Sequence, residues 1–410
     1  MKYLFDLDGT LTNCETLPLI ATNFDLADEI DKLTELTIKG DIPFVESFIH
    51  RVNILKKIPI SEVSQLLLSV DLQQPIVKFI KENLDDCIIV TGNCRVWIEP
   101  LAQKVGCKLI ASETDVENDK IKKLTKIIKK EDIVRQLQAE GEQVVFVGDG
   151  NNDAEAMRLA NISIASGLIH MPARSVLDVC NYLIFNAETL ARQLYQIKEE
   201  TPGYSVVLSC AGVGSRMGLG VTKALIKIND KLIIDSHLEN FKNVVDLRIV
   251  VGFQAMLLVE CVLKKRTDTI FVFNHDYFNS KTGYSYYLGA LHGREHAIEW
   301  DGDLLVHPQD ISEMLVADEY AAGSKVTSDE PIYMDVENHK VLRFHLHACA
   351  DSYEWTGPCS LKKHKILPNS LNVYDCIAKN LPLEFKPVEA YDIDTYEDYI
   401  RVSLITKDWS

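Results

Sequence analysis

The 410-residue sequence contains no apolar run that approaches the ~20 residues a helix needs to cross a bilayer. It also lacks a Cys-x-x-Cys pair, although it has ten cysteines, so we expect reduced thiols rather than a zinc site or a disulfide framework. Basic residues are fewer than acidic ones, 43 against 60, and the net charge of −17 disfavours nucleic acids and acidic lipid surfaces as partners. Because the first residues already form a predicted strand, we expect no signal peptide, no membrane insertion and a cytoplasmic location.

Two predicted strands in the first half each end in acidic residues. One leads into Asp6-Leu7-Asp8, and the other leads into Asp149-Gly150-Asn151-Asn152-Asp153. The carboxyl edge of a parallel sheet is where α/β folds bind ligands, and carboxylates gathered there repel one another unless a cation, most simply Mg²⁺, lies between them. A single Asp-Gly is more often an ordinary turn or a helix N-cap, but two such motifs in this order favour a metal site.

The first half resembles the haloacid dehalogenase superfamily of phosphatases, and within it the phosphoserine phosphatases. The resemblance also rests on Thr91-Gly92, which follows the predicted strand Cys87-Ile88-Ile89-Val90, and on Lys130 in Lys-Glu-Asp-Ile-Val-Arg-Gln-Leu. It implies that Asp6 is the nucleophile and Asp8 the general acid/base, and that both also lie at the metal. Thr91 would supply the hydroxyl that holds a phosphate oxygen, and Lys130 would neutralise charge. Asp149 would be a Mg²⁺ ligand, supported by the carboxylate of Asp153.

The chemistry of phosphate ester hydrolysis requires these residue types. A carboxylate nucleophile divides the hydrolysis into two easier steps, and Mg²⁺ with a lysine offsets the repulsion between two anions. The acid/base must first protonate the leaving alcohol and then deprotonate water. Lys130 follows Lys120, Lys122, Lys123, Lys126 and Lys129, so it could instead belong to a solvated lysine-rich face.

A predicted helical insert over residues of about 14–84 is similar to the small cap of phosphoserine phosphatases. Glu15 and Arg51 fall where that family holds the substrate's amino and carboxylate groups, and Arg suits bidentate carboxylate recognition. Arg51 could also be a surface residue beside an acidic helix. Gly92 and Asn93 are assigned to substrate binding as well, but Thr91-Gly92-Asn93-Cys94 replaces the family's Ser-Gly-Gly, so phosphoserine itself is in question.

Length and composition predict two domains: residues 1–195, a charged linker with Pro and Gly over 196–203, and residues 204–410. The second domain opens on a strand that runs into Ser209-Cys210-Ala211-Gly212-Val213-Gly214-Ser215-Arg216-Met217-Gly218, with Thr222-Lys223-Ala224-Leu225 just beyond. Small residues allow backbone N–H groups to surround phosphates, and Arg216 and Lys223 add positive charge for a triphosphate.

This loop resembles that of the nucleotidyltransferases that activate sugar and alcohol phosphates, and its Lys-Ala-Leu form resembles phosphocholine cytidylyltransferases. The chain departs from the family at Ser209-Cys210 and at Thr222, where the family has Ala-Ala and Pro. A dinucleotide-binding fold is the competing interpretation of the glycines, but it would leave Arg216 and Lys223 unexplained.

The resemblance implies further site residues in the second domain. The nucleotide would contact Ala211, Gly212, Gly214, Ser215, Arg216, Gly252, Asn274 and Ser285, and the Mg²⁺ ligands would be Asp310 and Asp394. Both aspartates could instead be helix N-caps. The aromatics Tyr284, Tyr286, Tyr287 and Trp355 could surround an ammonium group or simply pack.

We therefore expect an α/β protein with two Rossmann-like parallel-sheet domains, the first with a helical cap and the second like the nucleotide-diphospho-sugar transferases. The expected function is bifunctional: a Mg²⁺-dependent phosphatase joined to a transferase that uses CTP and a small phosphorylated metabolite, releases pyrophosphate and serves surface-polymer synthesis. A UTP- or GTP-dependent sugar-1-phosphate transferase, or a nucleotide-sensing domain fused to an active phosphatase, are the alternatives.

Overall fold

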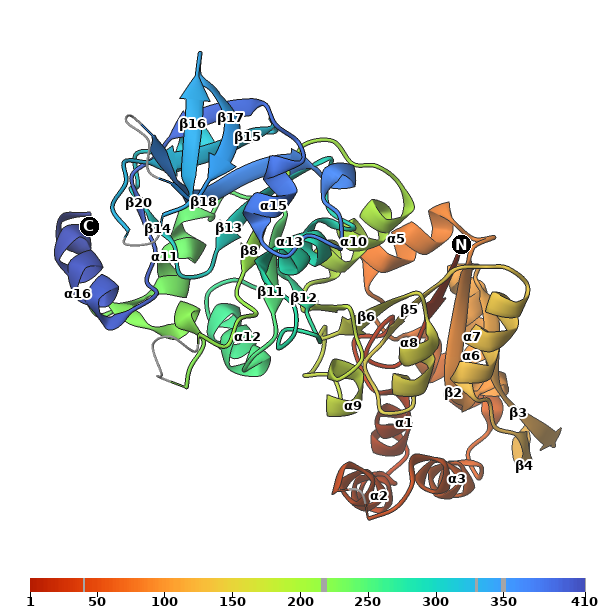
Figure 1. Cartoon of the computed structure of the whole chain (residues 1–410). Helices are drawn as coiled ribbons and strands as arrows, with labels where there is room; N and C mark the ends of the chain where they lie inside the picture. Colours follow the sequence, from red (N-terminus) through yellow and green to blue (C-terminus); the bar gives the residue numbers. More distant parts are fainter. Residues whose placement is uncertain (40, 215–219, 329–330, 348–351, 410) are drawn as a thin grey trace. The chain divides into compact units, whose positions relative to one another are not determined.

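The computed structural model describes residues 1–39, 41–214, 220–328, 331–347 and 352–409 (Figure 1). It forms two compact units, Met1–Ala191 and Arg192–Ser410. The division lies within helix α10 (Ala187–Lys198), so the helix occupies the first three positions of the linker expected over 196–203. None of the helices in the described ranges combines the length and apolarity needed to cross a membrane.

The first unit is built on a parallel sheet with one antiparallel edge strand, in the order β7-β6-β5-β1-β2-β3-β4. Runs of β-branched and aromatic residues, such as the fully buried Val144–Val147, predict strands covered on both faces. The strands are β1 (Lys2–Phe5), β2 (Cys87–Cys94), β3 (Lys108–Glu117), β4 (Lys120–Lys126), β5 (Val144–Gly148), β6 (Ile162–Ser166) and β7 (Tyr182–Ile184).

Helices cover this sheet with their apolar faces. The Phe79 ring of α5 meets the rings of Tyr3 and Phe5 at centroid distances of 5.1 and 6.5 Å. α6 ends where Gly106 takes a left-handed conformation, with φ of +85°. The covering helices are α5 (Gln74–Glu82), α6 (Arg95–Val105), α7 (Lys130–Ala139), α8 (Ala154–Leu159) and α9 (Arg174–Leu177).

Helices also form where the sequence predicted an insert. They are α1 (Thr16–Asn23), α2 (Ala27–Lys39), α3 (Phe44–Leu55) and α4 (Ile60–Leu68), all between β1 and β2. Figure 1 shows α2 and α3 side by side beyond α1, and α4 packs against α6. The insert therefore begins directly after the Asp6-Leu7-Asp8 motif and returns to the sheet before Thr91.

The second unit combines a parallel core with antiparallel strands. Its order is β15-β19-β17-β16-β18-β13-β8-β11-β12, and β13, β8, β11 and β12 are parallel to one another. The parallel strands are β8 (Tyr204–Ser209), β11 (Leu247–Val251), β12 (Ile270–Phe273) and β13 (His296–Asp301). The others are β15 (Tyr320–Ser324), β16 (Tyr333–Glu337), β17 (Lys340–His345), β18 (Tyr353–Lys362) and β19 (Leu383–Pro387).

Two short ribbons and several helices complete this unit. Gly289 lets α13 approach β8, because a Cβ there would lie 2.2 Å from Cγ1 of Val207. The ribbons are β9 (Lys227–Ile228) with β10 (Lys231–Leu232) and β14 (Leu305–Val306) with β20 (Ala390–Tyr391). The helices are α11 (Ile233–Asn240), α12 (Ala255–Leu263), α13 (Thr282–Ala290), α14 (Ile311–Met314), α15 (Val373–Ala378) and α16 (Tyr396–Ile405).

A buried polar network explains why the later part of α10 belongs to the second unit. The guanidinium of Arg248, which is fully buried, donates to Oδ2 of Asp246 at 3.2 Å and to Oε1 of both Gln193 and Gln196 at 2.7 Å. A buried charge is tolerated only when it is paired and hydrogen-bonded, so these contacts hold α10 against β11.

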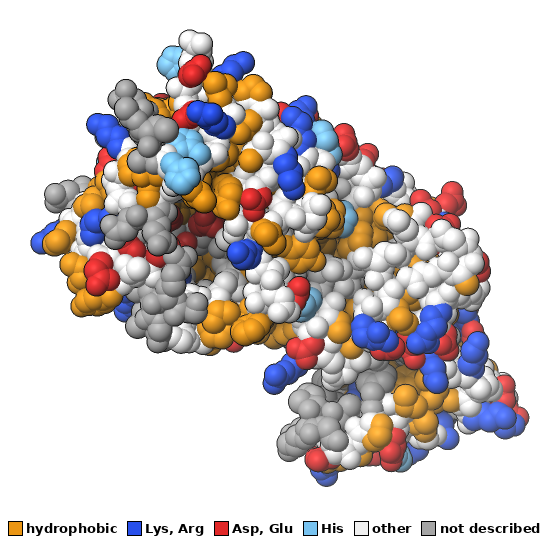
Figure 2. Space-filling model, viewed as in Figure 1, with side chains coloured by type: hydrophobic (Ala, Val, Ile, Leu, Met, Phe, Trp, Pro, Cys, Tyr) orange, Lys and Arg blue, Asp and Glu red, His pale blue; other side chains and the backbone are white. Residues whose placement is uncertain are grey.

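Charged side chains of both signs are interspersed on the face of the molecule that Figure 2 shows. Such mixing is typical of a solvated surface, whereas proteins that bind nucleic acid gather Lys and Arg on one face. On the described part of this face, basic residues are not gathered in that way.

Candidate active sites

The first candidate site forms where β1 ends and delivers Asp6 to the carboxyl edge of the sheet. Asp6 is 5% exposed, and Nζ of Lys130 lies 2.6 Å from its Oδ1. The same ammonium lies 2.6 Å from Oδ1 of Asp153, which is fully buried. Burial and the neighbouring Asp153 hold the pKa of Asp6 well above its usual range, although Lys130 opposes this shift.

Lys130 is distinguished from the other lysines of its stretch by burial. It is 3% exposed at the start of α7, whereas the preceding Lys129 is exposed. Burial by itself lowers the pKa of the Lys130 ammonium, but the carboxylates of Asp153 and Asp6 more than offset this and raise it. Lys130 therefore remains charged beside Asp6, and the solvated-face interpretation does not apply to it.

Asp149 completes a group of three buried carboxylates with Asp6 and Asp153, whose oxygens lie within 4.8 Å of one another. Oδ2 of Asp153 accepts hydrogen bonds from the backbone N–H groups of Asp149 and Gly150 at 3.2 and 3.0 Å, so Asp153 braces the loop. Burial, followed by repulsion from Asp6 and Asp153, raises the pKa of Asp149 to about 9. Such an oxygen-only donor set, with negative charge in excess of its single lysine, fits Mg²⁺.

The Asp8 side chain points elsewhere. Its Oδ1 accepts a hydrogen bond from the backbone N–H of Thr16 at 2.7 Å, and its carboxylate is not among the three that approach within 4.8 Å in the described residues. Burial and the nearby Glu15 raise the pKa of Asp8 to about 6. These contacts suit an acid/base and do not place the Asp8 carboxylate with the expected metal ligands.

Asn93 fixes the segment that orients Asp8. Its Nδ2 donates to Oγ1 of Thr16 at 2.6 Å, and its Oδ1 accepts from the backbone N–H of Cys94 at 2.8 Å. The backbone N–H of Asn93 donates to Oγ1 of Thr91, which is 1% exposed. Asn93 therefore connects the phosphate-binding strand end to the first turn of α1, a role that its position in the motif did not predict.

A cavity of about 650 Å³ joins this reaction centre to the helical insert. Arg51 of α3 and Glu15 at the start of α1 both line it. Nε and Nη2 of Arg51 donate to Oγ of Ser47 at 3.1 and 2.9 Å. The lining also includes Asp6, Asp8, Thr91, Gly92, Asn93, Asp149, His170 and Arg174.

Sequence reasoning missed His170 and Arg174. Nε2 of His170 lies 3.1 Å from Oε1 of Glu15 and 3.3 Å from Oδ2 of Asp149. The signal that could have found both basic residues is topological, because the segment that carries them follows β6 at the same carboxyl edge of the sheet as Asp6 and Asp149.

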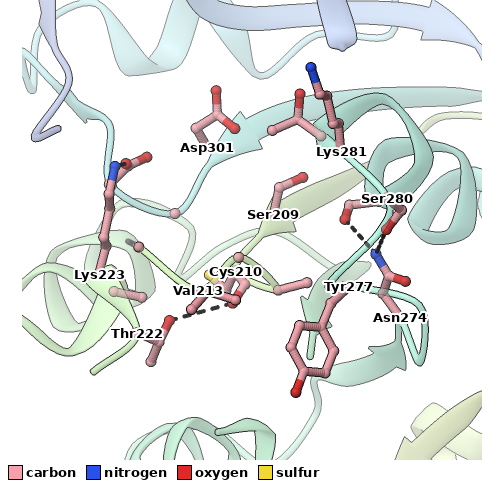
Figure 3. Close-up of a pocket in the computed structure, with 18 of the residues that line it drawn as sticks. Ser209, Cys210, Val213, Thr222, Lys223, Asn274, Tyr277, Ser280, Lys281 and Asp301 are labelled. Atoms are coloured by element: carbon pink, nitrogen blue, oxygen red, sulfur yellow. Dashed lines mark hydrogen bonds and ion pairs between the residues drawn. The ribbon is translucent and has the colours of Figure 1, made fainter. Parts of the chain in front are cut away.

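The second candidate site is a cavity of about 590 Å³ at the carboxyl ends of β8, β12 and β13 (Figure 3). Figure 3 shows Lys223 and Asn274 on different sides of it, with Ser209 and Cys210 between them. The lining includes the expected Ala211, Gly212, Gly214, Lys223, Asn274, Ser285 and Asp394, together with Asp301, Asp303 and Asp392. Ser215 and Arg216 lie outside the described residues.

The ammonium of Lys223 bridges two of these carboxylates. Nζ lies 2.5 Å from Oδ2 of Asp303 and 2.5 Å from Oδ1 of Asp394. Burial lowers the pKa of Lys223, but Asp303 and Asp394 outweigh it, so the pKa is raised. Gly214, with φ of +62°, abuts this lysine, since a Cβ there would lie 3.1 Å from Cγ of Lys223.

Asp303 takes the position that the sequence assigned to Asp310. The structure places Asp310 before the short helix α14, outside the cavity lining, where its Oδ2 accepts from the backbone N–H of Glu389 at 2.8 Å. This corrects the expectation for Asp310. Asp303 was not among the expected ligands, because Glu299 and Asp301 interrupt the apolar pattern of β13 and obscure the end of this strand just before Gly302-Asp303.

Gly252 and Asn274 support the cavity in different ways. A Cβ at Gly252 would lie 2.8 Å from the carbonyl oxygen of Ala211, so this glycine lets the turn after β11 lie against the loop and does not line the cavity. Nδ2 of Asn274 donates to Oγ of Ser280 and of Ser285 at 2.9 and 3.1 Å. Asn274 thereby orders the part of the cavity wall that contains Ser280 and Ser285.

Of the two interpretations of the aromatic residues, packing describes the three tyrosines. Tyr286 is fully buried and donates to the carbonyl oxygen of Ala297, so it packs in the core. Tyr284 and Tyr287 stack with ring centroids 6.0 Å apart, and none of these three tyrosines lines the cavity.

Comparison with known proteins agrees with the first site. Residues 3–161 match the family model of haloacid dehalogenase-like hydrolases. The phosphoserine phosphatase of Archaeoglobus fulgidus is 29% identical over 177 residues, which is 40% of this chain and 51% of that protein, so the match spans about half of its length. The phosphoserine phosphatase of Methanocaldococcus jannaschii is 29% identical over 175 residues, which is 40% of this chain and 83% of that protein.

Solved structures include neighbours for the other half of the chain. CTP:phosphocholine cytidylyltransferase from Streptococcus pneumoniae covers 50% of this chain with all of its own length, at 18% identity and a TM-score of 0.42. The N-terminal unit is similar to haloacid dehalogenase-like hydrolases and to phosphoserine phosphatases, and the structural neighbours of the C-terminal half include a nucleotidyltransferase.

Proposed function

We propose that the chain is a bifunctional enzyme, a Mg²⁺-dependent phosphatase followed by a nucleotidyltransferase that uses CTP. The observation that carries the first activity is the buried Lys130 between Asp6 and Asp153 at a strand end. The observation that carries the second is Lys223 between Asp303 and Asp394 beside a loop of small residues. Each arrangement puts a fixed cation next to carboxylates, as phosphoryl and nucleotidyl transfer require.

In the phosphatase, a carboxylate oxygen of Asp6 attacks the phosphorus atom and forms an aspartyl-phosphate. Asp8 donates its proton to the departing alcohol oxygen and then removes a proton from the water that hydrolyses the intermediate. A pKa of about 6 allows Asp8 to be populated in both protonation states near neutral pH. Lys130 and the Thr91 hydroxyl hold the phosphoryl oxygens throughout.

Asp6 and Asp149 are the residues that would hold Mg²⁺ in this site, and Asp153 keeps the Asp149 loop in place. The ion, when bound, compensates the charge on the phosphoryl oxygens. Burial is the main cause of the raised pKa values of Asp6 and Asp149, and repulsion between neighbouring carboxylates adds to it, so a bound cation would stabilise both as carboxylates.

In the transferase, a phosphate oxygen of the acceptor attacks the α-phosphorus of the nucleotide, and pyrophosphate leaves. Backbone N–H groups from Ala211 to Gly214 would hold the outer phosphates, and Lys223 would turn from its carboxylates to the phosphate charge. Asp303 and Asp394 would hold Mg²⁺, which supplies charge compensation at the reacting phosphates. Burial and Asp303 raise the pKa of the adjacent Asp301 to about 7, so acidic charge is in excess here as well.

CTP is favoured as the nucleotide because the loop and Lys223-Ala224-Leu225 resemble phosphocholine cytidylyltransferases. The acceptor would be the phosphate of a small alcohol, polyol or sugar, destined for a surface polymer. Pyrophosphate release from CTP, UTP, GTP and ATP with a panel of such phosphates tests this proposal. Release only with UTP or GTP would identify a sugar-1-phosphate transferase, and nucleotide binding without any release would identify a sensing domain.

A further inference from the structure

The described lining of the transferase cavity holds more carboxylates than the proposed metal site uses. Asp303 and Asp394 are the proposed Mg²⁺ ligands, and both pair with Lys223. Asp301 and Asp392 line the same cavity and are partly exposed, but neither carboxylate forms an ion pair with a basic residue that the structure describes. These two carboxylates therefore lack a close counter-charge within the described residues.

Strand β13 places a third carboxylate next to Asp301. Glu299 lies two residues before Asp301 on the strand, so both side chains lie on the same face of the sheet, and Ser209 of β8 pairs with Asp301 in register. Glu299 is fully buried, and in the described part of the chain neither of its carboxylate oxygens makes a hydrogen bond of good geometry. The hydroxyl of Ser209, which lines the cavity, makes none either. Buried polar groups are normally satisfied, so these atoms call for a donor or a cation from the ligand.

The three carboxylates lie close enough to repel one another. Burial, followed by repulsion from Asp301, raises the pKa of Glu299 well above its usual range; the nearby Ser209 hydroxyl opposes this in part, and Asp392 adds to it. Figure 3 shows Lys281, the other described lysine of the lining, to one side of Asp301, and it forms no ion pair with a described carboxylate. Positive charge from a ligand beside Asp301 and Asp392 would therefore stabilise all three as anions.

The spacing of these carboxylates favours an ammonium group over a bare metal ion. Among the described residues, the groups of three or more potential ligands whose atoms lie within 4.8 Å of one another do not include Glu299, Asp301 or Asp392. Oxygens that share a Mg²⁺ ion at about 2.1 Å lie within about 4.2 Å of one another. An ammonium donates over about 2.8 Å, so its acceptors can lie up to about 5.6 Å apart, and its three N–H groups can serve separate acceptors.

The lining also favours a primary ammonium over a quaternary one. Tyr277 is the one aromatic residue of the described lining, and the tyrosines of α13 do not line the cavity. A trimethylammonium group has no N–H to donate, and proteins usually hold it against aromatic faces. Carboxylates and a free hydroxyl instead suit a group that donates hydrogen bonds.

We propose that the transferase acceptor is a small phosphate ester with a primary ammonium, which Asp301 and Asp392 bind with support from the Ser209 hydroxyl and the buried Glu299. This inference rests on the proposed transferase activity and narrows its acceptor. Asp301 and Asp392 each precede a proposed Mg²⁺ ligand by two residues, a separation that an extended chain spans in about 7 Å at most. The ammonium and the reacting phosphate therefore lie only a few bonds apart, as in the phosphate of a short amino alcohol.

A matched pair of acceptors tests the proposal. O-Phosphoethanolamine and 2-hydroxyethyl phosphate differ only in an ammonium or a hydroxyl at the far carbon. With the full-length protein, CTP and Mg²⁺, initial rates of pyrophosphate release give kcat/KM for each acceptor before the phosphatase consumes it. The ratio should favour O-phosphoethanolamine by about tenfold to a hundredfold, the scale of one hydrogen bond to a buried charge. Phosphocholine, whose nitrogen carries no N–H group, should be used less efficiently than O-phosphoethanolamine.

Two variants test the carboxylates themselves. Asp301→Asn and Asp392→Asn keep the size of the side chain and remove its charge, so each should lower the ratio between the two acceptors by about tenfold. Asp310→Asn is the matched control, because it removes a carboxylate of the same unit that lies outside the cavity lining. It should leave the ratio unchanged.

Equal use of the two acceptors by the parent protein, a preference for phosphocholine, or a ratio that survives in both variants would overturn the inference. If the variants do not fold or lose all transfer, the comparison of the three acceptors in the parent protein decides the matter. Pyrophosphate release without a preference for the ammonium rejects only this site. No release with any acceptor and nucleotide rejects the transferase itself.

Discussion

The ammonium of Lys223 lies 2.5 Å from the carboxylate of Asp303, eighty residues further along the chain. Asp394 approaches the same ammonium at 2.5 Å from near the end of the chain. The two carboxylates come from separate elements of the chain, because Asp303 follows β13 and Asp394 precedes α16. Lys223 thus pairs with both residues proposed to bind Mg²⁺. When the nucleotide is bound, its ammonium would pair with the phosphates instead.

Removing either carboxylate should stop nucleotidyl transfer. We expect Asp303→Asn and Asp394→Asn each to lower the rate of pyrophosphate release by at least about two decades, the usual effect of losing one electrostatic stabiliser of a transition state. Single-turnover measurement of pyrophosphate release with saturating CTP and acceptor gives this rate.

Asp310→Asn is the matched control for these two variants. It should leave transfer within about threefold of the parent rate, and it should cost about 1 kcal/mol of stability because the hydrogen bond to the backbone of Glu389 is weakened. A loss of transfer equal to that of Asp303→Asn would restore Asp310 as the metal ligand and contradict the site described here.

The role of Asp8 should be distinguishable from that of the nucleophile, because the activity of Asp8→Asn should depend on the leaving group of the ester. In Asp8→Asn, p-nitrophenol needs no proton to depart, so p-nitrophenyl phosphate should give a burst of about one equivalent and then stall at the aspartyl-phosphate. An alkyl phosphate should give no burst, because its alkoxide must be protonated. Stopped-flow absorbance measures the burst, and full steady-state turnover with both esters would contradict the acid/base role.

Lys130 should matter for both catalysis and stability. Lys130→Met leaves Asp6 and Asp153 buried without their shared cation, so we expect phosphatase activity to fall by at least about two decades and the protein to be destabilised by about 3–5 kcal/mol. Added Mg²⁺ should recover part of the stability. Lys129→Met alters an exposed neighbour and should change neither property. Equal effects of the two variants in activity and thermal unfolding assays would contradict the assignment.

The reaction centre of the first unit could be read from the sequence because its parts are local. Asp6 and Asp149 each follow a strand directly, and parallel strands bring their carboxyl ends to one edge whatever the details of packing. Lys130 was assigned from the family resemblance, and its burial is what distinguishes it from the lysines that precede it. His170 could not be read in the same way, because its importance depends on which side chain faces it across the cavity.

The second unit was harder for a physical reason. Strand β13 carries Glu299 and Asp301, so its sequence does not resemble a continuous apolar strand, and Asp303 just beyond its end was not among the expected ligands. Strands β15 to β19 were also not anticipated, and some of their pairings, such as the parallel pairing of β15 with β19, join residues that are distant in the sequence. Asp394 was located because it lies in a short motif next to the capping box of α16.

His237 should make the second unit sensitive to acid. It is 1% exposed, Nε2 lies 3.2 Å from the carbonyl oxygen of Gly302, and burial lowers its pKa to about 4. The unfolded chain has a pKa near 6.5 and so binds a proton that the folded state does not, which means that stability is lost as pH falls from about 6.5 to about 4, by up to about 3 kcal/mol.

His237→Gln should remove this contribution, because the amide can still donate to Gly302 and does not titrate. Urea unfolding followed by tryptophan fluorescence at several pH values measures it, as a shallower pH dependence in the variant. His364→Gln, at an exposed histidine of the same unit, should keep the dependence of the parent protein. Identical pH profiles for the parent and His237→Gln would contradict the assignment.

The central claim is that one chain carries two chemically separate activities. Asp6→Asn removes the proposed nucleophile, and Asp303→Asn removes a proposed Mg²⁺ ligand in the other unit. The most direct measurement assays phosphate release from p-nitrophenyl phosphate and pyrophosphate release from CTP in both variants and in the parent protein. Asp6→Asn should lose only the first activity and Asp303→Asn only the second. Loss of both activities in either variant, or absence of either activity from the parent protein with the full substrate panels, would contradict the account.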